Sequence, residues 1–188
     1  MMNLSKKITV LIFLCLISIG SYSQCMQVPI SLNERVSSSD IVIEGRVLSK
    51  NSSWSEINGK RIVTHNTIEV YKVFKGNVTS STIDVVTKGG AVGTDMLVVT
   101  PSLQLNVGEV GIFTLEPGYH DQTTLVSYAE DQGFIKYNEE NNTAKALFDV
   151  YKSLNQLYGA IESITNSSHQ NITNYIGVSN IANKKANT

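Results

Sequence analysis

The stretch RIVTHNTIEVYKVF, residues 61–74, decides the fold of this chain. Its first half is polar, and its second half is rich in the β-branched and aromatic residues that favour strands. Ile68 and Val70 fall on one parity of such a strand, whereas Tyr71 falls on the other. A strand that is apolar on both parities is either buried on both faces or bulged, and bulges bend sheets into barrels. We therefore expect a long strand that crosses the core of a barrel, with Phe74 in that core.

Shorter runs on both sides of this stretch also have the pattern of strands. The pair Asn58-Gly59 ahead of it is a strong turn signal. The glycine-rich segment 89–93 lacks the Lys-Ser/Thr ending of a phosphate loop and leads into a β-like run, so it should bend a curved sheet. The expected fold is mainly β, a closed or partly closed antiparallel barrel of five or six strands. Its strands should include residues 41–48, 61–74, 83–87, 110–115 and 133–137.

Two helices should flank the barrel. Ser31 and Glu34 have the spacing of a capping box, which predicts a short N-terminal helix. Apolar residues recur every three or four positions over residues 144–165, which predicts an amphipathic C-terminal helix. This helix should cover an open side of the barrel, the alternative being that it binds a partner helix. We expect one domain over residues 24–165 and a weakly ordered tail over residues 166–188.

The first 23 residues have the three parts of a secretory signal peptide. Lysines precede an apolar run, residues 8–20, that is too short to span a membrane, and small residues follow at Ser21 and Ser23. Cleavage after Ser23 would leave Gln24 at the N-terminus. Acylation of Cys25 is the less favoured alternative, because Gln24 is a poor residue ahead of a lipidated cysteine. We expect a secreted protein, extracellular, periplasmic or at the cell surface, with no membrane span after cleavage.

Composition argues against several classes of function. The formal net charge is −1 and the charged fraction is 16%, with the basic residues scattered, whereas nucleic-acid binding needs a concentrated basic face. His65, His120 and His169 are far apart and lack metal-ligand spacing. Cys25 lies near a terminus, where a nucleophilic thiol would lack a preformed pocket. We therefore expect no nucleic-acid partner, no cofactor, no metal and no catalysis.

Two aromatic side chains are candidates for a binding face. Trp54 lies in the polar segment 51–59, and Tyr119 lies in a turn after the run 110–115. Aromatic anchors dominate the energetics of interfaces, which favours these two residues as contacts for a protein partner. The alternative is that each ring packs on its own barrel.

Several segments occur in an order that carries a family resemblance. They are CMQVP at 25–29, SDIVIEGRV at 39–47, GKRI at 59–62, IEVYKVFKG at 68–76 and SLQLNVGE at 102–109. In this order they resemble the landmarks of the netrin-like domain, most closely the inhibitory domain of the tissue inhibitors of metalloproteinases. The same segments also resemble N-terminal domains of secreted and surface proteins of Gram-negative bacteria. The resemblance spans about residues 25–115 and implies an OB-like barrel with flanking helices.

In the tissue inhibitors, the mature chain begins at a cysteine whose α-amino group and carbonyl chelate the catalytic zinc of the target. By this resemblance, Cys25 and Met26 are candidate binding residues. The chain differs from the pattern, because Gln27 replaces a second cysteine and Gln24 precedes Cys25. We therefore expect a secreted, non-catalytic binding module whose partner is a protein, a secreted or surface protease being one candidate. The alternative function is that of a metalloprotease inhibitor of the tissue-inhibitor type.

Overall fold

The computed structural model describes residues 27–57 and 59–173. The expected signal peptide and the candidates Cys25 and Met26 lie outside these residues. In chain order the elements are α2 (Leu32–Ser38), β1 (Ile41–Ser55), β2 (Arg61–Lys75), β3 (Thr82–Lys88), β4 (Gly90–Val92), β5 (Asp95–Leu97), β6 (Val110–Pro117), β7 (Leu125–Ser127), the 3-10 helix η1 (Glu130–Gly133), β8 (Phe134–Asn138), β9 (Thr143–Lys145), β10 (Val150–Tyr151), α3 (Leu154–Thr165) and β11 (Gln170–Asn171).

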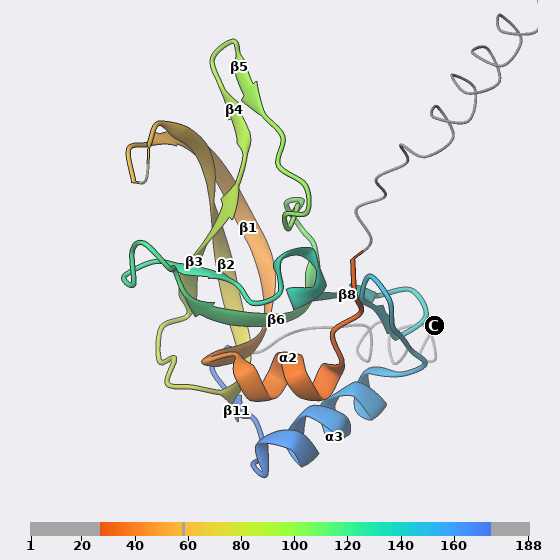
Figure 1. Ribbon diagram of the computed structural model, residues 1–188. Coiled ribbons are helices and arrows are strands. Elements are labelled where there is room, and N and C mark those ends of the chain that lie inside the picture. Colours follow the sequence, from red (N-terminus) through yellow and green to blue (C-terminus); the bar gives the residue numbers. More distant parts are fainter. Residues whose placement is uncertain (1–26, 58, 174–188) are drawn as a thin grey trace, which may run out of the picture.

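Five strands form a closed ring in the order β1, β2, β3, β7, β6 and back to β1 (Figure 1). Strands β8, β9 and β10 extend the sheet beyond β6. The prediction of a mainly β, barrel-like fold is therefore confirmed. One pairing differs from the expected antiparallel pattern, because β3 and β7 run parallel and meet only at Val85 and Leu125. The ring is thus closed weakly at this seam.

The long pair β1–β2 bends because its register shifts three times. Gly45 faces Val70 and Glu44 faces Lys72, so Tyr71 is an extra residue on β2. Such bulges turn side chains of one strand to both faces of the sheet and increase its curvature. Gly45 is required at this bend, because a Cβ there would lie 2.4 Å from the backbone oxygen of Glu69. The sequence pattern left burial on both faces and bulging as alternatives, and β2 shows both.

The buried apolar residues form two layers on opposite faces of this bent sheet. The barrel interior contains Ile43, Val47, Ile68, Val70, Val73, Val78, Val85, Leu103, Leu105, Phe113, Leu115 and Phe134. The second layer lies outside the ring, under α2 and α3, and contains Val36, Val42, Tyr71, Phe74, Val110, Ile112, Ile135, Tyr137, Ala144, Ala146, Leu154, Leu157 and Ile161. Phe74 is 3% exposed, so its burial is confirmed, but its expected place in the barrel core is wrong. The bulge turns its ring outward, 5.5 Å from the ring of Tyr158 on α3.

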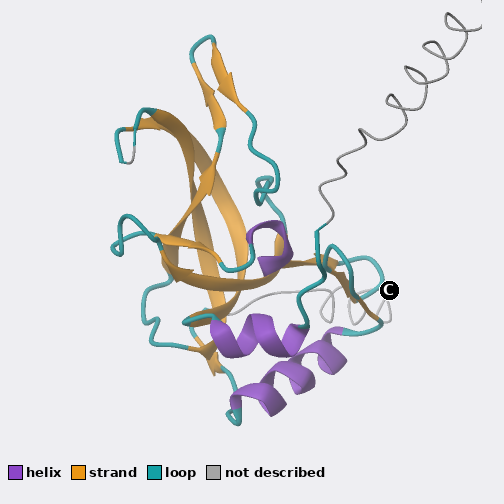
Figure 2. Ribbon diagram, in the orientation of Figure 1, coloured by secondary structure: helices purple, strands orange, loops and turns teal. Residues whose placement is uncertain are grey.

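The short N-terminal helix forms as expected, with the Ser31 hydroxyl accepting a hydrogen bond from the backbone N–H of Glu34 at 3.1 Å. It packs against α3 on the same side of the strands (Figure 2). The expected helix over residues 144–165 forms only from Leu154. Ala144 and Ala146 are buried with a period of two, as strands require, and Ser153 caps the helix that follows. No helix in the described part of the chain is long and apolar enough to cross a membrane.

The chain continues past α3 in a defined conformation up to residue 173. Gln170 pairs with Val73 and Asn171 with Lys72, so β11 lies against β2. The backbone N–H of Ile172 donates to the carbonyl of Tyr71 at 2.8 Å. The first residues of the expected tail therefore pack against the barrel.

Candidate binding surface

Trp54 lies near the end of β1, beside the turn to β2, and its side chain is 40% exposed. The ammonium of Lys60, from the other side of this turn, lies 4.6 Å from the centre of the indole ring. Such a cation over an aromatic face is attractive and holds both groups in place. The ring borders a cleft of about 720 Å³, here called the Trp54 cleft. Its lining consists of Trp54, Lys60, Arg61, Ile62, Lys88, Asp95, Met96, Leu97 and Val99.

The opposite wall of the Trp54 cleft is a projecting hairpin, β4–β5, which begins at the glycine-rich segment (Figure 1). Gly89 and Gly90 both have positive φ, 88° and 139°. A Cβ at Gly90 would lie 2.3 Å from the hydroxyl of Ser52, so only glycine allows this close approach to β1. The expected bend is present, and it produces a hairpin that was not predicted from the sequence. This hairpin exposes Met96, whose side chain is 75% accessible.

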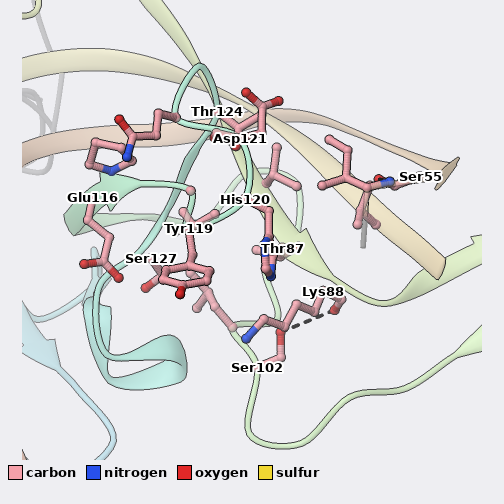
Figure 3. Close-up of a pocket in the computed structure, with 18 of the residues that line it drawn as sticks. Ser55, Thr87, Lys88, Ser102, Glu116, Tyr119, His120, Asp121, Thr124 and Ser127 are labelled. Carbon is pink, nitrogen blue, oxygen red and sulfur yellow. Dashed lines mark hydrogen bonds between the residues drawn. The ribbon is translucent and has the colours of Figure 1, made fainter. Parts of the chain in front are cut away.

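Tyr119 lies in the loop between β6 and β7 and is 90% exposed. Its ring meets the ring of His120 edge-on, with centroids 4.8 Å apart. Both lie over a cleft of about 740 Å³, here called the Tyr119 cleft, with Glu116 on one side and Lys88 on the other (Figure 3). The expectation that Tyr119 is an exposed aromatic residue is consistent with this position.

The loop that carries Tyr119 is fixed by Asp121. The carboxylate of Asp121 accepts the backbone N–H of Thr123 at 3.0 Å and the hydroxyl of Thr123 at 2.5 Å. These hydrogen bonds from Thr123 lower the pKa of the Asp121 carboxyl. The carbonyl of Asp121 also accepts the hydroxyl of Thr124 at 2.7 Å. Asp121 therefore acts as a turn residue that presents Tyr119.

The two clefts adjoin each other, because Arg61 and Lys88 border both. The structure thus brings Trp54 and Tyr119, which are far apart in sequence, to one continuous surface. We call this surface, the two clefts together, the hairpin end of the barrel. Sequence reasoning missed Met96, although the short apolar run after a glycine-rich turn was a signal that it could lie on a hairpin.

Charge is distributed unevenly over the hairpin end. Lys60, Arg61 and Lys88 line the Trp54 cleft with one carboxylate, that of Asp95. The Tyr119 cleft shares Arg61 and Lys88 but has four carboxylates, those of Asp40, Glu116, Asp121 and Glu130. Burial raises the pKa of Glu116, and the neighbouring charges of Asp40 and Glu130 raise it further. The hairpin end is therefore basic at the Trp54 cleft and acidic at the Tyr119 cleft.

The segment that follows Cys25 and Met26 is held by side chains of η1. The amide of Gln132 donates to the carbonyl of Val28 at 3.1 Å and accepts the backbone N–H of Ile30 at 2.8 Å. The amide of Gln27 donates to the carboxylate of Asp131 at 2.8 Å. Gln132 thus contacts the segment as a neighbouring strand would. Sequence reasoning missed Gln132, because nothing local connects it to a segment about a hundred residues earlier in the chain.

The three histidines lie at separate places. The Nδ1 atom of His65 lies 2.6 Å from a carboxylate oxygen of Asp84 on β3, and that of His169 lies 2.7 Å from Glu162 on α3. His120 lies in the Tyr119 cleft. No three His, Cys, Asp or Glu residues of the described ranges are grouped as a metal site.

Comparison of the chain with protein-family models, with curated proteins and with solved structures gives no match.

Proposed function

We propose that this protein is a secreted, non-catalytic binding module with an OB-like barrel, and that the hairpin end contacts a protein partner. The observation that carries this proposal is the convergence of two exposed aromatic side chains, Trp54 and Tyr119, on adjoining clefts. Tyrosine and tryptophan are enriched at the centres of protein interfaces, and clefts give them pockets to complement. The five-stranded ring with one weak seam supports the OB-like assignment, since OB-folds are five-stranded, partly open barrels.

The experiment is affinity capture from the secreted proteins of the host, followed by titration of the captured protein. Trp54→Ala and Tyr119→Ala should each weaken binding by about 2 kcal/mol or more, as the loss of an aromatic anchor does. Phe148→Ala is the matched control, since Phe148 is likewise exposed, at 47%, and lies between β9 and β10, two strands that contact α3. Binding that is insensitive to both cleft substitutions would contradict the proposal.

Secretion is part of the proposal and rests on the signal-like leader. The intact mass of the exported protein should correspond to a chain that begins at Gln24, with cyclisation to pyroglutamate. A lipid on Cys25, or an uncut Met1, would contradict it.

Inhibition of a metalloprotease is the second candidate. The hydrogen bonds that hold the N-terminal segment against η1 favour it. A chelating N-terminus loses binding energy if it must be ordered on binding, and the hydrogen bonds that the segment makes with Gln132 and Asp131 supply some of that order. If this function holds, a chain trimmed to begin at Cys25 should inhibit a zinc protease far better than the form that begins at Gln24. Cys25→Ser should then abolish inhibition, whereas Trp54→Ala should leave it unchanged. We expect the opposite pattern, with Trp54 required for partner binding.

A further inference from the structure

One strand that lines the Trp54 cleft, β5, has an unpaired edge. Within the described residues, β5 pairs with β4 alone. Val92 and Asp95 flank a two-residue turn and face each other, and hydrogen-bonded and non-hydrogen-bonded pairs alternate along such a hairpin. The next residue of β5, Met96, therefore turns its backbone N–H and C=O away from β4. An edge of this kind is a template for an added strand.

The chemistry of the Trp54 cleft selects the strand that would be added. Three of the nine residues that line it are cations, Lys60, Arg61 and Lys88, and one is an anion, Asp95. The other five are apolar or aromatic, and among them Trp54 and Met96 are exposed. Complementarity of charge favours an acidic occupant, and the apolar residues favour one with aliphatic or aromatic side chains between its acids.

We propose that the Trp54 cleft binds an extended segment of a partner protein in which acidic and apolar residues alternate, added as a strand to the edge of β5. In an extended segment, successive side chains point to opposite faces. Apolar side chains on one face would contact Met96, while carboxylates on the other face would reach Lys60, which lies over the Trp54 ring, and Lys88, which would exchange its exposed pair with Glu130. This inference rests on the proposed function and names the partner's contacting segment.

The chain supplies its own reporter, because Trp54 is its only tryptophan. The test titrates the mature protein with a short capped peptide in which Glu and Leu alternate, and follows the tryptophan emission. The same peptide with Gln in place of Glu, and another with Lys, are the matched probes. We expect a blue shift with the Glu peptide, weaker binding at higher salt, and at least about fivefold weaker binding of the Gln peptide, since partly exposed ion pairs contribute modestly.

Two sets of variants locate the segment. Lys60→Gln and Lys88→Gln should each weaken the Glu peptide roughly two- to fivefold, whereas Lys145→Gln on β9 should not. Met96→Pro removes the outward N–H while the pairing with β4 stays, because edge strands tolerate proline. It should bind roughly three- to tenfold more weakly than Met96→Ala, the matched loss of side chain. Equal binding of the two Met96 variants would overturn the strand addition.

The failure of this inference differs from the failure of the proposed function. Equal binding of the Glu, Gln and Lys peptides would overturn the inference that the bound segment is acidic, although the cleft would still be a binding site. Self-association that Met96→Pro abolishes, measured by light scattering, would identify a second copy as the occupant and overturn the proposal. No response to any peptide, with a captured partner that still needs Trp54, would overturn only the inference. A captured partner that needs neither Trp54 nor Tyr119 would contradict the proposed function itself.

Discussion

The helix-covered face and the hairpin end of the barrel hold their charges in opposite ways. Under the helices, the carboxylate of Glu44 is fully buried and accepts hydrogen bonds from Lys72 at 2.7 Å, from Tyr137 at 2.9 Å and from Tyr158. At the hairpin end, the side chains of Lys88 and Glu130 form an ion pair while 53% and 38% exposed. Burying a charge is costly unless partners surround it, whereas exposed pairs contribute little to stability. The first region therefore fixes the fold, and the second keeps its charges accessible to solvent.

A second buried charge supports this division. The guanidinium of Arg35 on α2 is 1% exposed. It donates to the carboxylate of Asp149 at 2.5 Å and to the carbonyl of Gln132 at 2.7 Å. Through these contacts α2 is tied to η1 and to the segment before β10.

The hydroxyl of Tyr137, which donates to the buried carboxylate of Glu44, also has a shifted pKa. Desolvation, followed by the nearby charge of Glu44, raises the pKa of Tyr137 well above its ordinary value, so its hydroxyl remains a donor throughout the neutral range.

The largest effect is expected at Phe74, in the layer between the barrel and α3. Phe74→Ala should lower the free energy of unfolding by about 3–5 kcal/mol, because a large buried ring leaves a cavity. Denaturant unfolding measures this cost. The adjacent Lys75→Ala should cost only about 1 kcal/mol or less, the value of its hydrogen bonds to the last carbonyls of α2. Equal and small costs at both positions would show that the ring is not buried under α3.

A matched pair of lysines tests the buried charges against the exposed ones. Lys72→Met leaves the buried carboxylate of Glu44 without its cation and should lower the free energy of unfolding by about 3–5 kcal/mol. Lys88→Met breaks the exposed pair with Glu130 and should change it by less than about 1 kcal/mol. Both variants are compared by chemical denaturation at neutral pH. Similar losses of unfolding free energy for the two variants would show that the two regions do not differ in how their charges contribute to stability.

An intermediate effect is expected at Gln132, which is 5% exposed. Gln132→Ala removes the hydrogen bonds to the carbonyl of Val28 and the N–H of Ile30 and leaves these backbone groups without partners. It should lower the free energy of unfolding by about 1–3 kcal/mol. Hydrogen exchange should show faster exchange of the Ile30 amide, which donates to Gln132. Unchanged protection of that amide would show that the N-terminal segment is held by other contacts.

The smallest effect on stability is expected at the hairpin end itself. Trp54→Ala removes a half-exposed ring and its contact with the Lys60 ammonium, and should lower the free energy of unfolding by about 1 kcal/mol or less. Thermal unfolding with and without the substitution measures this. A loss as large as that of Phe74→Ala would make Trp54 a structural residue and would favour packing over binding.

The sequence predicted those parts of the fold whose signals are local. The alternating and apolar pattern of residues 61–74 fixed the position of β2 almost to the residue, and the spacing of Ser31 and Glu34 located the start of α2. The predicted helix was too long at its start, because Leu147 and Phe148 continue the helical stripe in sequence while they lie exposed between β9 and β10.

What could not be predicted depends on contacts between distant segments. Glu44 alternates with apolar neighbours like an exposed strand residue, and only Lys72, Tyr137 and Tyr158, from three other elements, make its burial possible. The same holds at the hairpin end. Trp54 and Tyr119 were recognisable as aromatic residues in polar segments, but their clefts adjoin only because the ring of strands closes.

Under the proposed function, the hairpin end binds the partner and the helix-covered side does not. The most direct test is calorimetric titration of the captured partner with three proteins: the mature chain, Trp54→Ala and the matched Phe148→Ala. We predict that Trp54→Ala weakens binding by about 2 kcal/mol or more while Phe148→Ala leaves the affinity unchanged. Loss of binding on Phe148→Ala, with the affinity of Trp54→Ala unchanged, would place the interface on the helix side and contradict the proposed function.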